Sequence, residues 1–252
     1  MLIAFMIFIF IIVIASFLYS FTFSKKSNVE KVNSNDHIEI TFEYNEPRKT
    51  GKLLRDFPAN YTIIDVETTG LKPREDKIIE IGAIKYRDNK EIDYFSTLVK
   101  VDYIPNFISS YTNITNKMVK NAPRVDEAIK QFYDFVGDDI LVGYNVPFDI
   151  KFLYDALYEV SNGELLLNND FIDVMYIAKR VLKDLENYKQ VTVASYYNIS
   201  IDNLHRAMGD CKLCSAIYEC LQKDILEKWG AFNKFYKKYP KIKNKIENNK
   251  NE

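Results

Sequence analysis

The run "YTIIDVETTG", residues 61–70, constrains the fold more than any other part of the chain. Tyr61 to Val66 are mostly β-formers, but Asp65 and Glu67 stand two apart at the end of the run. Residues two apart share one face of a strand. Buried carboxylates are costly unless they are paired or bind metal, and two this close repel each other. The run therefore predicts a strand that ends at a divalent cation site, with oxygen ligands that suit Mg²⁺ or Mn²⁺.

The segments that follow alternate between strand and helix patterns. Apolar and alternating runs predict further strands, and apolar residues at helical spacing predict helices. We expect strands over 77–87, 92–100 and 140–145, and helices over 123–137, 146–160, 171–184, 192–199 and 210–229. Strands followed by helices in this order indicate an α/β domain, residues 61–229, with a mixed β-sheet flanked by helices.

The first 23 residues have the composition of a membrane anchor. Residues 2–23 carry no charge, and a helix of that length spans about 33 Å, enough for a bilayer core of about 30 Å. Lys25, Lys26 and Lys31 follow it. The positive-inside rule then predicts a single-pass membrane protein with the C-terminal bulk of the chain in the cytoplasm. Cleavage after "IAS" at 14–16 would instead make the chain an exported protein.

Two further segments flank the domain. Residues 24–60 are polar, with one alternating run, "HIEITFEY", and we expect a juxtamembrane linker. Residues 230–252 form a Lys-rich tail that we expect to be frayed. From Ala231 onward the tail has seven Lys and two Glu, although the whole chain has a net charge of -1. The tail suits either a solvated end or a grip on phosphates, of nucleic acid or of lipid.

The three cysteines, Cys211, Cys214 and Cys220, lie within one predicted helix. An odd number in a single cluster does not make a disulfide framework. We expect small core side chains in a reducing compartment.

Two more acids and a histidine belong to the predicted helices. Asp149 falls in the first turn of the helix that Pro147 opens. Asp210 continues the apolar stripe of the last long helix, which predicts an inward-facing carboxylate. His205 precedes Asp210 by five residues, and its ordinary pKa near 6.5 makes it a usable base.

Read together, "DVETTGL", "GYNVPFDIKFL" and "HRAMGD" resemble the three motifs of the DEDD superfamily of 3′–5′ exonucleases, in its histidine branch. That family includes the proofreading subunit of bacterial DNA polymerase III, ribonuclease T and oligoribonuclease. The resemblance covers about Tyr61 to Leu226 and implies a ribonuclease H-like fold. Tyr144 stands where many members have His or another polar residue.

The resemblance also assigns roles. It implies His205 as the general base, and Asp65, Glu67, Asp149 and Asp210 as catalytic residues that ligate two cations, Mg²⁺ or Mn²⁺. It implies that Thr68, Thr69 and Leu71 contact the terminal nucleotide, with Asn145 lining the same pocket. Asp173 matches a frequent family Asp, although helix capping explains it equally well.

The implied function is a metal-dependent 3′–5′ exonuclease with a two-metal mechanism. It would hydrolyse phosphodiester bonds at the 3′ ends of single-stranded DNA or RNA and release nucleoside 5′-monophosphates. The alternatives are a dedicated RNA-end-trimming exoribonuclease and a non-catalytic, membrane-tethered nucleic-acid-binding module. A nuclease that has lost its activity usually lacks one of the metal ligands. In this chain all five expected site residues, the four acids and the histidine, are present. The oligomeric state stays open.

Overall fold

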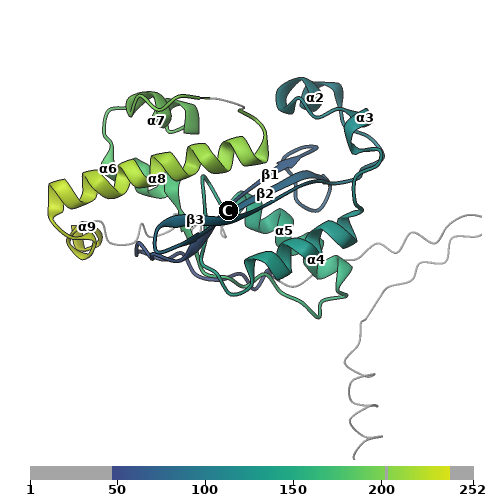
Figure 1. Cartoon of the computed structure of the whole chain (residues 1–252), viewed down its shortest axis with the longest axis horizontal. Coiled ribbons are helices and arrows are strands. Elements are labelled where there is room, and N and C mark those ends of the chain that lie inside the picture. The colour runs from purple at the N-terminus through teal and green to yellow at the C-terminus, as the bar shows by residue number, and fades with distance from the viewer. Residues whose placement is uncertain (1–46, 202–203, 239–252) are drawn as a thin grey trace, which may run out of the picture. The chain divides into compact units, whose positions relative to one another are not determined.

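A mixed sheet forms the centre of the domain (Figure 1) in the computed structural model, which describes residues 47–201 and 204–238. In this part of the chain the sheet has five strands in the order β3-β2-β1-β4-β5. Strands β1, β2 and β3 are antiparallel, and β4 and β5 run parallel to β1. The strands are β1 (Tyr61–Thr68), β2 (Ile78–Arg87), β3 (Lys90–Leu98), β4 (Leu141–Gly143) and β5 (Phe171–Asp173). This confirms the expected α/β fold with a mixed sheet.

Helices cover both faces of the sheet (Figure 1). Helices α4 (Val125–Val136) and α5 (Pro147–Val160) pack on one face. The long helix α8 (Ala207–Trp229) packs against β1 and β2 on the other face, next to α6 (Val174–Val181) and α7 (Gln190–Tyr196). Two apolar clusters fill the spaces between these layers.

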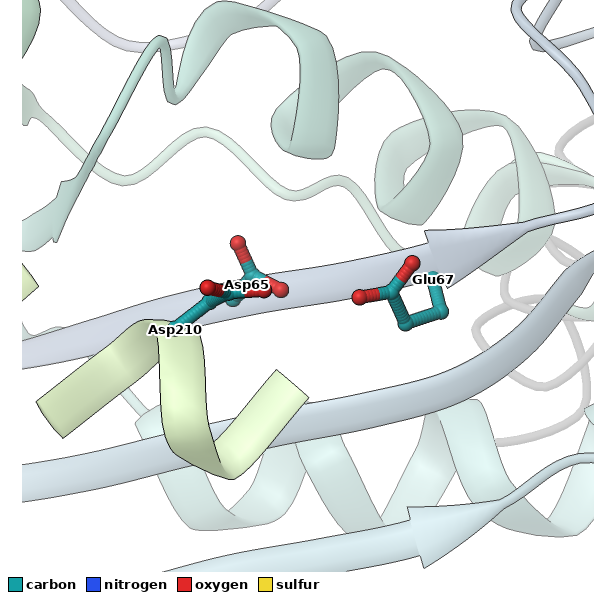
Figure 2. Close-up of side chains that lie close together, drawn as sticks. All are labelled: Asp65, Glu67 and Asp210. Carbon is teal, nitrogen blue, oxygen red and sulfur yellow. The ribbon is translucent and has the colours of Figure 1, made fainter. Parts of the chain in front are cut away.

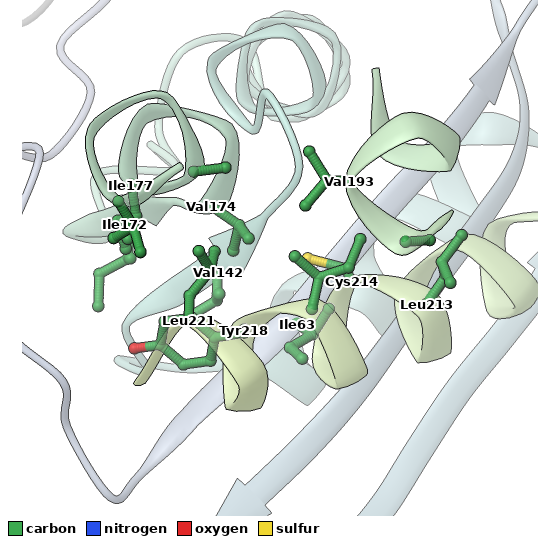
Figure 3. Close-up of a cluster of buried hydrophobic side chains, with 14 of the residues drawn as sticks. Ile63, Val142, Ile172, Val174, Ile177, Val193, Leu213, Cys214, Tyr218 and Leu221 are labelled. Carbon is green, nitrogen blue, oxygen red and sulfur yellow. The ribbon is translucent and has the colours of Figure 1, made fainter. Parts of the chain in front are cut away.

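The alternation along β1 sorts its side chains between the two layers. Tyr61 and Ile63 belong to the cluster beneath α8, whereas Ile64 and Val66 belong to the cluster beneath α4 and α5. Figure 3 shows Ile63 in the first cluster with Cys214, Tyr218 and Leu221 of α8. Cys211 and Cys214 are buried free thiols, as expected of core residues, whereas Cys220 is only partly buried. Asp65 and Glu67 continue the row that faces α8.

Two of the predicted elements differ from the structure. Phe171 to Asp173, expected as the start of a helix, form strand β5, and helix α6 begins only at Val174. Three residues are too few for a strand pattern to be recognised along the chain. Helix α8 is also not the last helix: α9 (Phe232–Lys238) follows it, and Phe235 is fully buried. The expectation of a frayed end from Gly230 onward is therefore wrong as far as Lys238.

The compact unit also begins earlier than the predicted start at Tyr61. Residues from Arg48 onward belong to it. Leu53 forms a bridge with Phe171 beside β5, and Arg48 donates from Nε to Asp155 Oδ1 at 2.6 Å. The part of the predicted linker from Arg48 to Asn60 thus packs on the domain.

Two short helices lie between β3 and α4 that the sequence patterns did not predict. They are α2 (Asn106–Thr112) and α3 (Asn116–Val119). Ile104, Ile114 and Val119 pack with Ile79 of β2 in a small third cluster. This cluster holds α2 near the end of the sheet, and Tyr111 of α2 lies close enough for the charge of Glu67 to act on it. Figure 1 shows α2 and α3 beyond that end of β1 and β2.

The predicted anchor (1–23), the run "HIEITFEY" and the last part of the Lys-rich tail lie outside the described residues. Within 47–201 and 204–238, no helix has both the length and the apolar character needed to cross a bilayer.

Candidate active site

Three acidic side chains meet at the carboxyl end of β1. Asp65 and Glu67 come from β1, and Asp210 comes from the first turn of α8 (Figure 2). One carboxylate oxygen from each lies within 4.8 Å of the others. Helix α8 packs across β1, and this brings together acids that are far apart in the sequence.

The fourth predicted ligand, Asp149, reaches the same strand from the other helix layer. Pro147 is the first residue of α5, which places Asp149 in the first turn. Asp149 is 4% exposed, and its Oδ1 accepts a hydrogen bond of 3.0 Å from the Val66 amide, between Asp65 and Glu67. Its oxygens are not part of the group within 4.8 Å, but its charge acts on Asp65.

Burial and neighbouring carboxylates raise the pKa values of all four acids. Burial, and then the charges of Asp149 and Asp210, raise the pKa of Asp65 well above its usual range. Burial is also the first cause that raises the pKa of Glu67 to about 8, that of Asp149 to about 8 and that of Asp210 to about 6. Such a group is unfavourable as four free anions near neutral pH, and divalent cations would relieve the repulsion.

His205 lies beside Asp210, at the entrance to helix α8. Its backbone N–H donates to Asp210 Oδ2 at 3.1 Å, and its backbone has a φ of 59°. The imidazole packs against the ring of Tyr111 of α2, with centroids 3.8 Å apart. Partial burial lowers the pKa of His205. The ring is therefore neutral at physiological pH, which is the state that a general base needs.

The threonine hydroxyls in the turn after β1 form hydrogen bonds within the turn. The Thr68 hydroxyl donates to the Gly70 carbonyl at 2.6 Å, and the Thr69 hydroxyl accepts from the Lys77 amide at 2.9 Å. Gly70 does not have a positive φ, and a side chain there would meet the Asp76 carboxylate. Leu71 is 81% exposed. Of the predicted contacts in this turn, Leu71 is the side chain free to touch a ligand.

Asn145 and Asp173 are joined at the ends of β4 and β5. Asn145 has a φ of 62°, and its N–H donates to Asp173 Oδ1 at 2.9 Å. The same oxygen caps helix α6 by accepting from the Met175 amide at 3.1 Å. Asp173 thus has a structural role that also fixes the backbone of Asn145.

A pocket of about 530 Å³ opens next to Asp210 and His205. Asn145 and Tyr144 line it from the end of β4, and Tyr111 lines it from α2. The Tyr144 hydroxyl donates to the Tyr188 carbonyl at 2.8 Å, which ties the β4 end to the opposite wall. That wall also carries two lysines, Lys179 and Lys189. The pocket therefore joins a concentration of acids to aromatic rings and cationic groups.

Two charged residues at this site, Glu80 and Arg206, are not among those predicted from the sequence. Glu80 of β2 is the cross-strand partner of Glu67 and is 3% exposed. Arg206 donates to it from Nε and Nη2, at 2.7–3.2 Å. The sequence does carry a signal for this pair, since Glu80 stands inside the apolar run "KIIEIGAIKYR" and a charge in a buried strand requires a partner.

The arrangement fits divalent cations by its chemistry. Asp65, Glu67 and Asp210 offer hard oxygen ligands from both the sheet and α8, and Asp149 retains an oxygen beyond the one bonded to Val66. Oxygen donors of this kind suit Mg²⁺ and Mn²⁺. An acid group at the end of the central strand of such a mixed sheet is consistent with the ribonuclease H-like class of fold that the resemblance implies.

Comparison with known proteins gives the family. Residues 62–218 match the model of the family described as "Exonuclease". The chain belongs to this exonuclease family, so the expected enzyme class, a 3′–5′ exonuclease hydrolase, is confirmed at the level of the family.

Relatives with similar sequences are much longer proteins. The chain is 38% identical over 173 residues to the PolC-type DNA polymerase III of Clostridium perfringens. The aligned region covers 68% of this chain and 12% of that protein. The chain is 33% identical over 172 residues to the PolC-type DNA polymerase III of Bacillus subtilis, with 67% of this chain and 12% of that protein covered. The chain thus spans about an eighth of the length of these relatives.

Solved structures share the fold. Exonuclease I of E. coli, in complex with a dT13 oligonucleotide, superposes with a TM-score of 0.59 at 18% identity, over 69% of this chain and 43% of that one. Exonuclease X, in complex with 5′ overhanging duplex DNA, superposes with a TM-score of 0.53 at 25% identity, over 68% of this chain and 93% of that one.

Proposed function

We propose that the chain is a metal-dependent 3′–5′ exonuclease that shortens single-stranded DNA one nucleotide at a time and releases nucleoside 5′-monophosphates. One observation carries the proposal: Asp65, Glu67 and Asp210 converge within 4.8 Å beside the pocket that His205 lines. Buried like charges are costly, so their convergence in a family of exonucleases supports a catalytic cation site.

The proposed ligands are the four predicted acids, Asp65, Glu67, Asp149 and Asp210. Two bound Mg²⁺ or Mn²⁺ ions would acidify the attacking water and stabilise the leaving 3′ oxygen. His205 accepts the proton of that water, because its lowered pKa leaves it neutral and it lies next to Asp210. General-base catalysis of this kind contributes about 10²–10⁴ in rate.

The terminal nucleotide is proposed to lie between the turn after β1 and the pocket. Because Thr68 and Thr69 use their hydroxyls inside the turn, they shape it. The exposed Leu71 side chain contacts the last base, and Asn145 lines the wall next to it. Lys179 and Lys189 lie where the preceding phosphates would pass.

The names of the relatives support DNA over RNA. The chain is 38% identical to part of a DNA polymerase, and Exonuclease X is bound to DNA in the matching structure. RNA-end trimming is the second candidate, since the described site offers no group placed to exclude a 2′-hydroxyl.

The test uses the whole chain, purified in a mild detergent, with 5′-labelled single-stranded DNA and RNA of the same sequence and Mn²⁺. Shortening from the 3′ end by single nucleotides is expected, faster on DNA, and EDTA abolishes it. Faster digestion of RNA would reassign the substrate. Oligonucleotide binding without any hydrolysis would support the non-catalytic module instead.

The membrane anchor is a separate proposal. The uncharged residues 2–23, followed by Lys25 and Lys26, support a single-pass helix with the domain in the cytoplasm. Alkaline extraction of membranes, and protease treatment of intact and permeabilised cells, test it. The domain should stay in the membrane fraction and be cleaved only after permeabilisation. Cleavage in intact cells would indicate an outward-facing or exported domain.

The Lys-rich tail is proposed to bind phosphates. Because Phe235 of α9 is buried, a truncation has to begin after Lys238 to leave the domain intact. Removal of residues 239–252 should weaken oligonucleotide binding and lower its salt dependence. An unchanged salt dependence would indicate a solvated end.

A further inference from the structure

We propose that Glu80 and Arg206 are positioning residues that hold His205 in place for catalysis. The inference rests on the proposed function, in which His205 is the general base. Neither residue is among the predicted ligands or substrate contacts. Both lie next to the acid group on the sheet face that α8 covers.

The contact between β2 and the start of α8 is dense and directional. Arg206 donates to Glu80 Oε1 from Nη2 at 2.7 Å, and its Nε donates to both oxygens at 3.1–3.2 Å. The Ala207 amide donates to Glu80 Oε2 at 2.9 Å. A single carboxylate thus fixes two consecutive residues, in the forked geometry that is specific to arginine.

The backbones approach closely at the same point. A Cβ at Gly82, two residues along β2, would lie 2.8 Å from the Ala207 carbonyl carbon. The start of α8 therefore packs directly on the backbone of β2, next to the ion pair.

His205 is the residue that depends most on this contact. It directly precedes Arg206 and has a φ of 59°, a backbone conformation that a non-glycine residue keeps only when its surroundings hold it. Among the described residues, Asp210 and Tyr111 also contact it, through the hydrogen bond from its amide and through the ring contact. Neither fixes the residue on its C-terminal side, which Glu80 does through Arg206.

Asp210 depends less on the ion pair. It lies inside α8, a helix of 23 residues that packs on β1 and β2 along its length. Many apolar contacts hold such a helix, including the buried Cys214, Ile217 and Leu221. Loss of the ion pair should therefore displace the base and leave the cation ligands in place.

The chain offers a matched control on the same strand. Arg87 donates from Nη2 to both oxygens of Asp139, at 2.7 and 2.9 Å, at the other end of β2. The side chains of Arg87 and Arg206 are 34% and 36% exposed. Arg87→Lys therefore perturbs another arginine–carboxylate ion pair of the same strand, away from the acid group.

The experiment compares kcat and KM of the wild-type chain, Arg206→Lys, Arg206→Gln and Arg87→Lys on one oligonucleotide, below the melting temperature of every variant. Arg206→Lys keeps the charge near Glu67 but loses the fork. We expect its kcat to fall about 10- to 100-fold, because a displacement of about 1 Å has such an effect. KM should stay unchanged, Arg206→Gln should fall at least as far, and Arg87→Lys should remain within about twofold of the wild type.

A second comparison separates positioning of His205 from a general loss of structure. In a His205→Ala background, Arg206→Lys should change kcat by less than about twofold, because the residue through which it acts is gone. An equal fall in both backgrounds would overturn the inference, and so would a rise in KM alone or an unchanged kcat. An inactive wild-type chain would instead contradict the proposed function.

Discussion

At the amino end of β1 the carboxylate of Asp139 is surrounded by hydrogen-bond donors and cationic side chains. At the carboxyl end of β1, by contrast, several carboxylates lie next to one another. Asp139 accepts from Thr62 Oγ1 at 2.6 Å and from Arg87, and Lys85 Nζ lies 3.9 Å from it. At the other end, the described residues contain Asp65, Glu67, Asp149, Asp210 and Glu80, with Arg206 as their cationic partner.

The difference separates a structural cluster from a functional one. The charges around Asp139 are compensated inside the protein, so this end of the sheet contributes to folding. Asp65, Glu67, Asp149 and Asp210 have raised pKa values, and Arg206, the arginine beside them, pairs with Glu80. A protein keeps such an arrangement where a ligand supplies the missing charge. The following substitutions test whether the Asp139 end of the sheet contributes to folding and the Asp65 end to catalysis.

The largest effect is expected from the acid group itself. Asp65→Asn or Asp210→Asn should lower kcat by at least about 10³-fold, because the cations contribute several kcal/mol to transition-state stabilisation. Asp139→Asn is the counterpart at the other end, and should lower the melting temperature while kcat stays near that of the wild type. The release of nucleotides measures kcat, and thermal unfolding measures the melting temperature. Full activity in Asp65→Asn would remove the basis of the comparison.

His205→Ala should lower kcat by about 10²–10⁴-fold. Burial lowers the pKa of His205, so the wild-type rate should fall with decreasing pH only below about 6.5, as the imidazole becomes protonated. The variant should lose that part of the pH dependence. A wild-type profile that His205→Ala leaves unchanged would assign the proton transfer to another group.

The stability of the fold should depend on pH through the acid group. In EDTA, the folded acid group keeps protons that the unfolded chain releases, because the pKa values of Glu67 and Asp149 are raised to about 8. The melting temperature should therefore fall as pH rises from 5 to 8, by about 2–4 °C for each kcal/mol lost. Asp65→Asn should melt above the wild type at pH 8, and Asp139→Asn below it. Mg²⁺ should raise the wild-type value and close the gap to Asp65→Asn.

The smallest effect is expected at the rim of the site. Leu71 is 81% exposed, so Leu71→Ala should leave the melting temperature unchanged and raise KM about threefold to tenfold through a lost apolar contact. Ile92 of β3, 56% exposed, provides the control, and Ile92→Ala should leave KM unchanged. A similar KM for both variants would remove Leu71 from the substrate site.

Much of the fold could be predicted because its patterns are local. Helices α4 and α5 lie close to the predicted ranges, and Gly137 and Pro147 mark the expected ends. Strand β5 was missed because three residues carry too short a pattern, and α9 because its lysines hid the buried Phe235. The alternation of side chains along β1 decides which of them face α8 and which face α4 and α5.

The sequence by itself determined that Asp65 and Glu67 share a strand face, that Asp210 points inward, and that a histidine precedes it. Such features follow from the two- and 3.6-residue periods of strands and helices, which act over a few neighbours. Only the tertiary structure decided that Asp210 reaches Asp65, that Asp149 binds the Val66 amide, and that Glu80 holds Arg206. These contacts join segments far apart in the chain, and their distances depend on how the α8 and α5 layers pack against the sheet.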